Sequence, residues 1–165
     1  MKKAMVVRCP FCPPNVDKVK FAESKHFVAV YNIAPILPGH SLIVPKRHVS
    51  SVLHLSEGEL CEMMLFSRRV IEILKVAFKA MAFDWTIQDG EAAGQTVPHF
   101  HLHLIPRRYN DLPQPGDWYP KLRESQVQII DSEQRDKLSP QEMQQIIANL
   151  VEVVSQIDPA LIPRS

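Results

Sequence analysis

The hydrophobic and polar positions along the first half of the chain predict short strands joined by turns. Residues 27–31 are apolar and rich in β-branched and aromatic side chains, which is typical of a strand. A proline- and glycine-rich connection at 34–39 leads into residues 40–45, which read as the returning strand of an antiparallel pair. A third long strand is predicted at 83–88, and a loop of small residues follows at 89–94.

Two helices are predicted from apolar residues spaced three and four apart. The first begins after Ser56, because Glu59 lies three residues on and completes a capping box. Its apolar face continues for about 25 residues and is expected in the core. The residues that define this face are Leu60, Met63, Met64, Ile71, Leu74, Phe78 and Met81. The second helix begins at Ser139 with proline at its first position and ends near Pro159.

Residues 95–105 contain three histidines that alternate with three apolar residues. Side chains on a strand alternate between its faces, so one strand would place all three imidazoles on one face, about 6–7 Å apart. The apolar partners would then enter the core. The six residues are His99, His101 and His103 on one face and Phe100, Leu102 and Leu104 on the other. Histidine gives less apolar burial than a hydrophobic residue and has titratable nitrogens that need partners. Three of them on one face therefore favour a functional site over a solvated edge strand.

The remaining segments complete the expected fold. Residues 106–120 carry four prolines and are predicted to be irregular, and residues 127–130 are predicted to form a short strand. The order of strands, long helix, further strands and closing helix favours an α+β domain built on an antiparallel sheet. We expect a single domain over residues 1–165, with a core at about 5–110 and a C-terminal loop and helix at 111–165.

Composition and charge exclude several classes of function. The chain has 165 residues, 19 of them basic and 18 acidic, which gives a formal charge of +1. No general attraction to nucleic acid or to an anionic membrane is expected from this balance. The apolar run near the N-terminus stops at Arg8, well short of a signal-peptide core, so we expect a cytoplasmic protein.

Two of the three cysteines lie close together, as Cys9 and Cys12. In a reducing compartment such a pair is more often metal-binding or redox-active than part of a structural disulfide. Zinc prefers four cysteine or histidine ligands, and His48 is a candidate for a third. A redox couple and two buried thiols are the alternatives.

The three histidines allow two kinds of chemistry. On one strand they would span about 13 Å, too far to share one metal ion. A neutral imidazole, in contrast, attacks phosphorus well and leaves well, so it splits one displacement into two easier ones. Gln95 and Thr96 precede the histidines and offer uncharged hydrogen-bond groups of the kind expected around a phosphate. Phosphoryl or nucleotidyl transfer is therefore the favoured class.

The run from Gly94 to Ile105, which contains all three histidines, strongly resembles the histidine-triad (HIT) superfamily of nucleotide hydrolases and transferases. The resemblance extends over residues 31–48 and 83–107. Gln88, Thr96 and Asn32 favour the fragile-histidine-triad (Fhit) branch of dinucleoside polyphosphate hydrolases. The Hint branch usually has asparagine, serine and aspartate at these three positions.

The resemblance implies a catalytic set. His101 would be the nucleophile that attacks the α-phosphorus and becomes nucleotidylated, after which water would release the monophosphate. His103 and His99 would assist from either side. His40 would support the triad by hydrogen bonding.

The resemblance also implies a substrate-binding set and a metal site. Asn32 would contact the ribose hydroxyls, and Gln88, Gln95 and Thr96 would bind phosphate oxygens. In several HIT proteins with an N-terminal cysteine pair, zinc is held in a structural role by four residues that correspond here to Cys9, Cys12, His48 and His99. Typical Fhit proteins lack that pair, so this chain departs from the Fhit pattern, and zinc would bar His99 from acid–base work.

The expected function is hydrolysis of dinucleoside polyphosphates, such as diadenosine triphosphate or tetraphosphate, through a nucleotidyl-histidine intermediate. The alternatives are Hint-like hydrolysis of nucleoside phosphoramidates, nucleotidyl transfer to phosphate as in phosphorylases, and nucleotide binding in a regulatory protein. The resemblance further implies a homodimer whose two sheets join. Polyphosphate substrates commonly carry Mg²⁺, and the sequence leaves open whether this ion accompanies the substrate here.

Overall fold

The computed structural model describes residues 9–127 and 137–164. Five strands form one sheet in the order β1-β2-β3-β5-β4, and every neighbouring pair is antiparallel. The strands are β1 (Lys20–Glu23), β2 (Phe27–Tyr31), β3 (Ser41–Pro45), β4 (Ala82–Thr86) and β5 (Leu102–Arg107). The helices are α1 (Glu57–Phe78), α2 (Trp118–Val127) and α3 (Pro140–Ile157). Short 3-10 turns are η1 (Val16–Lys18), η2 (Val52–His54), η3 (Glu91–Ala93), η4 (Pro115–Asp117) and η5 (Pro159–Leu161).

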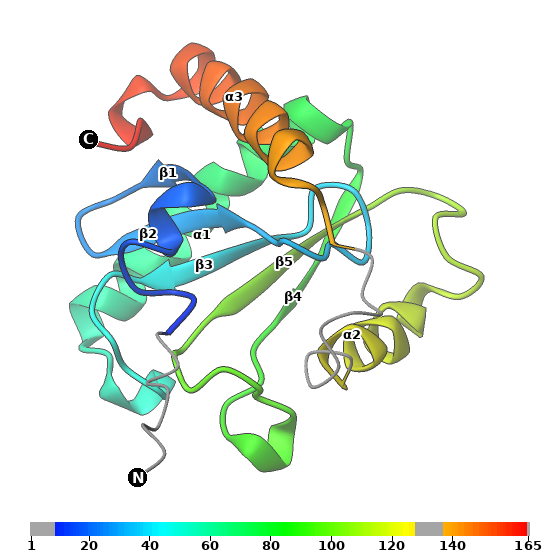
Figure 1. The fold of residues 1–165 in the computed structure, drawn as a ribbon, viewed down its shortest axis with the longest axis horizontal. Helices are drawn as coiled ribbons and strands as arrows, with labels where there is room; N and C mark the ends of the chain where they lie inside the picture. The colour runs from blue at the N-terminus through cyan, green and yellow to red at the C-terminus, as the bar shows by residue number, and fades with distance from the viewer. Residues whose placement is uncertain (1–8, 128–136, 165) are drawn as a thin grey trace, which may run out of the picture.

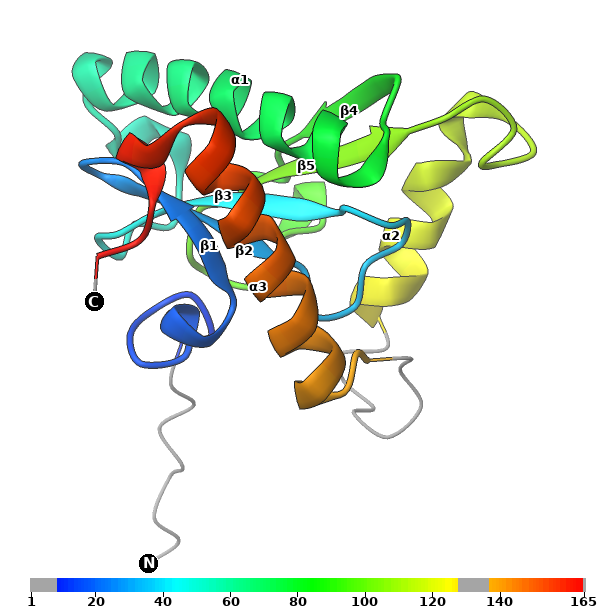
Figure 2. The same cartoon turned by 90° about the horizontal axis from the view of Figure 1, so that it is seen from above.

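One face of the sheet is covered by α1, and the other carries the N-terminal segment, defined as residues 9–19 (Figures 1 and 2). Alternation along the strands assigns side chains to the two faces. Ile43, Leu102 and Leu104 belong to the core cluster that includes α1 and α3 residues. Val30 and Leu42 belong to a second cluster on the opposite face, where Val16 of η1 also packs. Strand β2 is buried along its whole length, as a strand covered on both faces must be.

The predicted helix starts are confirmed. Ser56 accepts a hydrogen bond from the backbone of Glu59 and Glu59 returns one to Ser56, and the same reciprocal pair joins Ser139 and Glu142. Each box satisfies N–H groups that a helix start leaves unpaired.

The sheet order and the helices confirm the predicted α+β fold, with an antiparallel sheet, one long helix and a C-terminal helix. The single domain over residues 1–165 stays a prediction.

The prediction that one strand holds all three histidines is wrong in part. Strand β5 starts at Leu102, so only His103 lies within it. The backbone N–H of Phe100 donates to the carbonyl of Val49 instead of joining the sheet, and pairing with β3 begins at Leu102. The burial of the apolar partners is confirmed, since Phe100, Leu102 and Leu104 are all buried.

Three other expectations need correction or limits. The segment predicted to be irregular at 106–120 ends in η4 and the first turn of α2. Met63 is buried, but Met64 in α1 and Met81, which lies beyond the end of α1, are more than half exposed, so these methionines are not all in the core. Of the strand predicted at 127–130, Val127 ends α2 and residues 128–130 lie outside the described residues. Strand β1 was not predicted.

The turn before β3 is shaped by Gly39. Its φ is +90°, and a Cβ built there would lie 2.7 Å from Pro106 and 2.9 Å from the Phe78 ring. Its backbone N–H donates to the hydroxyl of Tyr31 at 3.0 Å. Only glycine combines this backbone conformation with so close an approach, and the turn delivers His40 to its buried position. None of the helices in the described parts of the chain is both long and apolar enough to cross a membrane.

Candidate active site and metal site

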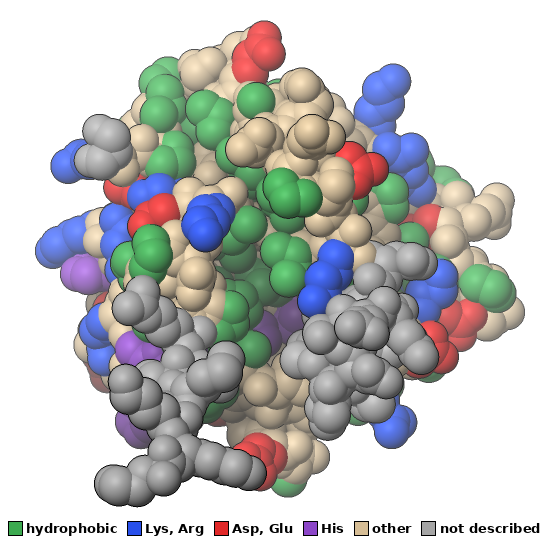
Figure 3. All heavy atoms as spheres, viewed as in Figure 1, with side chains coloured by type: hydrophobic (Ala, Val, Ile, Leu, Met, Phe, Trp, Pro, Cys, Tyr) green, Lys and Arg blue, Asp and Glu red, His purple; other side chains and the backbone are tan. Residues whose placement is uncertain are grey.

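A cavity of about 410 Å³ opens on the sheet face that carries the N-terminal segment. In the space-filling view this face has a hollow with hydrophobic and histidine side chains on its floor (Figure 3). The wall is largely apolar and carries a limited number of polar side chains, which is the usual composition of a small-molecule site. The lining residues are Pro10, Phe11, Asn15, Lys18, Val19, Val30, Tyr31, Asn32, Ile33, Leu42, Thr96, Val97, His101, His103, Leu122 and Lys137.

His101 lines this cavity with one nitrogen held in a defined state. Its Nδ1 lies 2.8 Å from the carbonyl oxygen of His99, which can only accept, so Nδ1 carries the proton. The neutral ring therefore has its lone pair on Nε2. Burial lowers the pKa of His101, which favours this neutral form. An imidazole with a fixed tautomer and a free lone pair is suited to nucleophilic attack.

His103 is set by a chain of two contacts that begins at the backbone. The N–H of Ile36 donates to Nδ1 of His40 at 3.3 Å, so the proton of a neutral His40 lies on Nε2. That Nε2 lies 2.9 Å from Nδ1 of His103 and donates to it. The proton of His103 is thus on its own Nε2, which is buried and has no partner among the described residues. Burial, and then the neighbouring His40 and His101, place the pKa of His103 well below 6.5.

The predicted substrate-binding residues fall into two groups. Asn32 and Thr96 line the cavity together with His101 and His103. Gln88 and Gln95 do not line it. Gln88 is buried with its Oε1 unpartnered among the described residues.

Gln95 braces two loops through its side-chain amide. Its Oε1 accepts from the backbone N–H of Gly90 at 2.7 Å. Its Nε2 donates to the backbone carbonyl of Ser50 at 2.9 Å. Both ends of the amide are therefore occupied by backbone groups.

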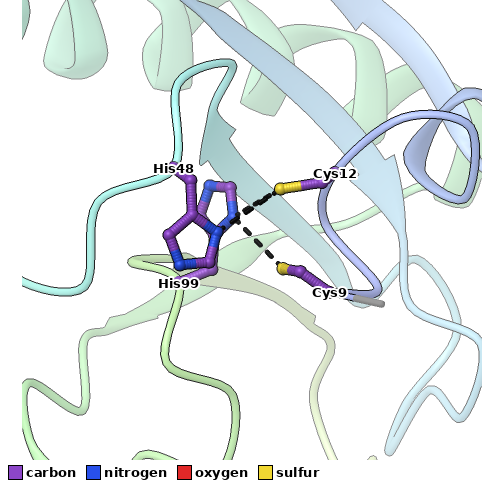
Figure 4. Close-up of side chains that lie close together, drawn as sticks. All are labelled: Cys9, Cys12, His48 and His99. Carbon is purple, nitrogen blue, oxygen red and sulfur yellow. Dashed lines mark hydrogen bonds between the residues drawn. The ribbon is translucent and has the colours of Figure 1, made fainter. Parts of the chain in front are cut away.

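Four predicted metal ligands converge beside this cavity (Figure 4). The candidate ligand atoms of Cys9, Cys12, His48 and His99 all lie within 4.8 Å of one another. Nδ1 of His99 is 3.4 Å from the sulfur of Cys9 and 3.6 Å from that of Cys12. Nδ1 of His48 is 3.4 Å from the sulfur of Cys12. The four residues form a candidate Cys2His2 metal site.

The second nitrogen of His99 fixes its orientation toward the sulfurs. Its Nε2 lies 2.9 Å from the carbonyl oxygen of Pro45 and donates to it. The lone pair of the neutral ring is then on Nδ1, toward Cys9 and Cys12. Ligating histidines usually have such a second contact on the far nitrogen. Burial, opposed by this hydrogen bond and reinforced by His48 and His101, lowers the pKa of His99 to about 4.

Several cavity residues were not predicted from the sequence. Phe11 could have been predicted, because it lies between Cys9 and Cys12 in the sequence and must therefore be close to any site that these cysteines form. Lys18 and Val19 belong to the same segment. Leu122 and Lys137 come from the C-terminal third, and their sequence context contains no signal that brings them to the cavity.

Comparison with known proteins places this site in a family. Residues 14–110 match the model of the HIT domain. The chain is 39% identical over 106 residues to the asymmetrical bis(5'-nucleosyl)-tetraphosphatase of Schizosaccharomyces pombe, a match covering 64% of this chain and 58% of that protein. It is 41% identical over 83 residues to the bis(5'-adenosyl)-triphosphatase of Dictyostelium discoideum, covering 50% and 56%. The chain thus matches somewhat more than half the length of these relatives.

The fold is also similar to that of solved structures. A zinc-bound histidine triad family protein from Mycobacterium smegmatis superposes with a TM-score of 0.62. The superposition covers 86% of each chain at 24% sequence identity. At this identity the likeness supports the fold alone.

Proposed function

The chain belongs to the HIT family, and we propose that it hydrolyses dinucleoside polyphosphates such as diadenosine triphosphate or tetraphosphate to a nucleoside monophosphate. The observation that carries the proposal is the pair of imidazoles in one cavity. Nε2 of His101 carries a lone pair, and the Nε2–H of His103 has no partner in the part of the chain that the structure describes. Two relatives whose names state tetraphosphatase and triphosphatase activity support the substrate class.

In the proposed first step, Nε2 of His101 attacks the α-phosphorus. The P–N bond forms as the bond from phosphorus to the bridging oxygen breaks, and that oxygen leaves with the remaining phosphates. The positive charge that develops on the His101 ring is stabilised by the carbonyl oxygen of His99, which accepts from Nδ1. The Nε2–H of His103 donates to an oxygen on which negative charge grows.

In the second step, water attacks the same phosphorus. The P–N bond breaks, its electron pair returns to Nε2 of His101, and the water proton passes to the released monophosphate or to solvent. Imidazole is a good leaving group from the nucleotidyl-imidazolium because the departing ring is neutral. The enzyme returns to its starting state.

We assign substrate contacts from the lining of the cavity. Asn32 binds the ribose hydroxyls and Thr96 binds phosphate oxygens, since both line the cavity with His101. The apolar part of the wall, which includes Val30 and Leu42, takes the base. Phosphate binding by Gln88 and Gln95 stays a prediction.

We propose that the Cys2His2 cluster binds zinc in a structural role. Bond lengths of about 2.3 Å to sulfur and 2.0–2.1 Å to nitrogen in a tetrahedral site imply sulfur–nitrogen separations of about 3.5 Å. The separations here are 3.4, 3.4 and 3.6 Å, so the residues fit the ion. His99 then serves as a ligand and not as an acid or base. Zinc would anchor the segment that precedes His101.

We propose that the protein is a homodimer joined through β4. This strand lies at one end of the sheet order, so no strand among the described residues pairs with its outer edge. Trp85 and Ile87 are each 39% exposed on or just beyond it. Sedimentation at the mass of a single 18.8 kDa chain would contradict this assembly.

The test of the proposed function is product analysis. Purified protein is incubated with diadenosine triphosphate, diadenosine tetraphosphate and an adenosine phosphoramidate, beside the His101→Ala variant. AMP plus ADP from the triphosphate, absent with the variant, is the expected result. Cleavage of the phosphoramidate alone would assign the Hint-like activity instead, and binding without turnover of any substrate would assign a nucleotide-binding regulatory role.

A further inference from the structure

One wall of the cavity is built by the loop that holds the two cysteines. Residues 9–19 of this loop contain both Cys9 and Cys12, and five of its other residues face the cavity. These five are Pro10, Phe11, Asn15, Lys18 and Val19. The candidate metal site and the nucleotide cavity therefore share a structural element.

Phe11 is a residue of this loop whose ring contacts both His99 and His101. Its ring centroid lies 5.0 Å from that of His101, with the planes at 57°. It lies 5.9 Å from that of His99, nearly perpendicular at 86°. Both are within the range of favourable aromatic contacts. Phe11 thus touches one metal ligand and the proposed nucleophile while it lines the cavity.

Among the described residues, the start of the loop is tied to the rest of the chain by the two cysteines and by the packing of Phe11, and not by backbone hydrogen bonds. Its backbone hydrogen bonds are internal, with Cys12 donating to Cys9 at 3.3 Å and Asn15 donating to Cys12 at 3.0 Å. The Asn15 side chain also donates to the carbonyl of Cys9. The sulfurs contact His48 in the loop after β3 and His99 in the segment before β5, so the cysteines join this loop to two other segments. Ligation at the sulfurs would therefore restrict where Phe11 can lie.

We propose that Phe11 is a positioning residue that couples metal binding by the cysteine loop to nucleotide binding in the cavity. When the four ligands are joined, Phe11 is held against His101 and the nucleotide meets a preformed wall. When they are not joined, part of the binding free energy is spent in ordering the loop. Coupling of this kind is reciprocal, so the nucleotide must also tighten metal retention by the same factor. The inference rests on the proposed function, because it takes the cavity to bind a nucleotide.

The test measures both sides of the coupling with AMP and zinc as probes. Calorimetry gives the AMP affinity of zinc-loaded and zinc-stripped protein, and chelator competition gives the zinc affinity with and without AMP. We expect each affinity to rise about tenfold when the other ligand is bound, within the usual range of such couplings. In Phe11→Ala both ratios should fall close to one, while zinc affinity without AMP changes less than about twofold. Tyr109→Ala, at an aromatic that is 82% exposed, is the control and should keep the full ratio.

A second measurement uses loaded protein alone, in case the stripped chain unfolds. Saturating AMP should slow zinc transfer to a chelator in the wild type and leave the rate unchanged in Phe11→Ala. Equal AMP affinity with and without zinc would overturn the coupling, and full coupling in Phe11→Ala would overturn the role of Phe11. Failure of AMP to bind the zinc-loaded wild type would instead contradict the proposed function, so the two failures are distinguishable.

Discussion

Nε2 of His40 lies 2.9 Å from Nδ1 of His103 and donates to it, so the proton of the neutral His103 ring lies on Nε2. The state of His40 is in turn set by the backbone N–H of Ile36, 3.3 Å from its Nδ1. A backbone group outside the cavity therefore selects the tautomer of a histidine within it. The role proposed for His103 as a donor depends on this relay.

The relay predicts the effect of removing His40. In His40→Ala, the His103 ring loses its tautomer control, so fewer molecules present an Nε2–H to the substrate. We expect kcat to fall about tenfold to a hundredfold, below the full effect of losing a general acid. Steady-state kinetics with diadenosine triphosphate measure this. His54→Asn, at an exposed histidine, is the control, and an unchanged kcat in His40→Ala would contradict the relay.

The buried state of His103 predicts how stability depends on pH. Its pKa is well below 6.5 in the folded chain, chiefly because of burial and then because of His40 and His101. Unfolding releases the ring to its ordinary value, so below about pH 6.5 the unfolded state binds the extra proton and stability falls as the pH falls.

The measurement is the free energy of unfolding in urea of zinc-loaded protein at about pH 7.5 and about pH 5. His103→Asn removes the group, so this variant should lose about 1–2 kcal/mol less than the wild type over that interval. Equal losses in the two proteins would show that His103 can be protonated in the folded state.

The conformation of Gly39 predicts a large cost for a single methyl group. Gly39→Ala forces a side chain into positive φ and within 2.7 Å of Pro106. We expect a loss of about 2–4 kcal/mol of unfolding free energy, from backbone strain and overpacking together. Gly58→Ala is the matched control, because a Cβ there meets nothing within 4 Å and lies in a helix. That variant should be neutral or more stable by up to about 1 kcal/mol.

The metal site predicts a specific loss on removal of one ligand. Cys12→Ser should abolish zinc binding, measured as metal content after purification and dialysis. The melting temperature should fall by about 5–10 °C, since the stabilisation by bound ion is lost. Cys61→Ser, at an exposed cysteine in α1, should retain one zinc per chain and the wild-type melting temperature. Equal metal content in the two variants would contradict the assignment.

Lys137, which lies outside the part of the chain that matches the HIT domain, is predicted to contribute to substrate affinity. Lys137 lines the cavity although the family match ends at residue 110. A cation at the cavity attracts a polyphosphate, so Lys137→Gln should raise KM about threefold to tenfold, less at high salt. Lys75→Gln, on the exposed side of α1, should leave KM unchanged. The same KM in both variants would mean that Lys137 does not attract the substrate.

The features predicted correctly from the sequence are those set by local physical chemistry. The capping boxes at Ser56 and Ser139 mark helix starts because their hydrogen bonds lie within four residues. The burial of Phe100, Leu102 and Leu104 follows from alternation, even though the strand begins only at Leu102. Spacing within one segment was sufficient for these.

The features that were missed depend on distant contacts or on tolerance of proline. Helix α2 was not predicted because Pro120 argues against a helix, yet it lies in the first turn, where no intrahelical N–H is needed. The contacts of the Gln95 amide with the backbone of Gly90 and Ser50 join distant segments and were not predicted, while phosphate binding by Gln95 stays a prediction. Lys137 reaches the cavity because Leu138 donates to the carbonyl of Ile33, a contact without a sequence signal.

The most direct test of the proposed mechanism is the stereochemical course at the α-phosphorus. A substrate made chiral there with sulfur is hydrolysed in isotopically labelled water, and the configuration of the released monophosphate is determined. Two successive displacements, first by His101 and then by water, predict overall retention of configuration. Inversion would mean that water attacks the substrate directly, and it would contradict the nucleotidyl-histidine intermediate.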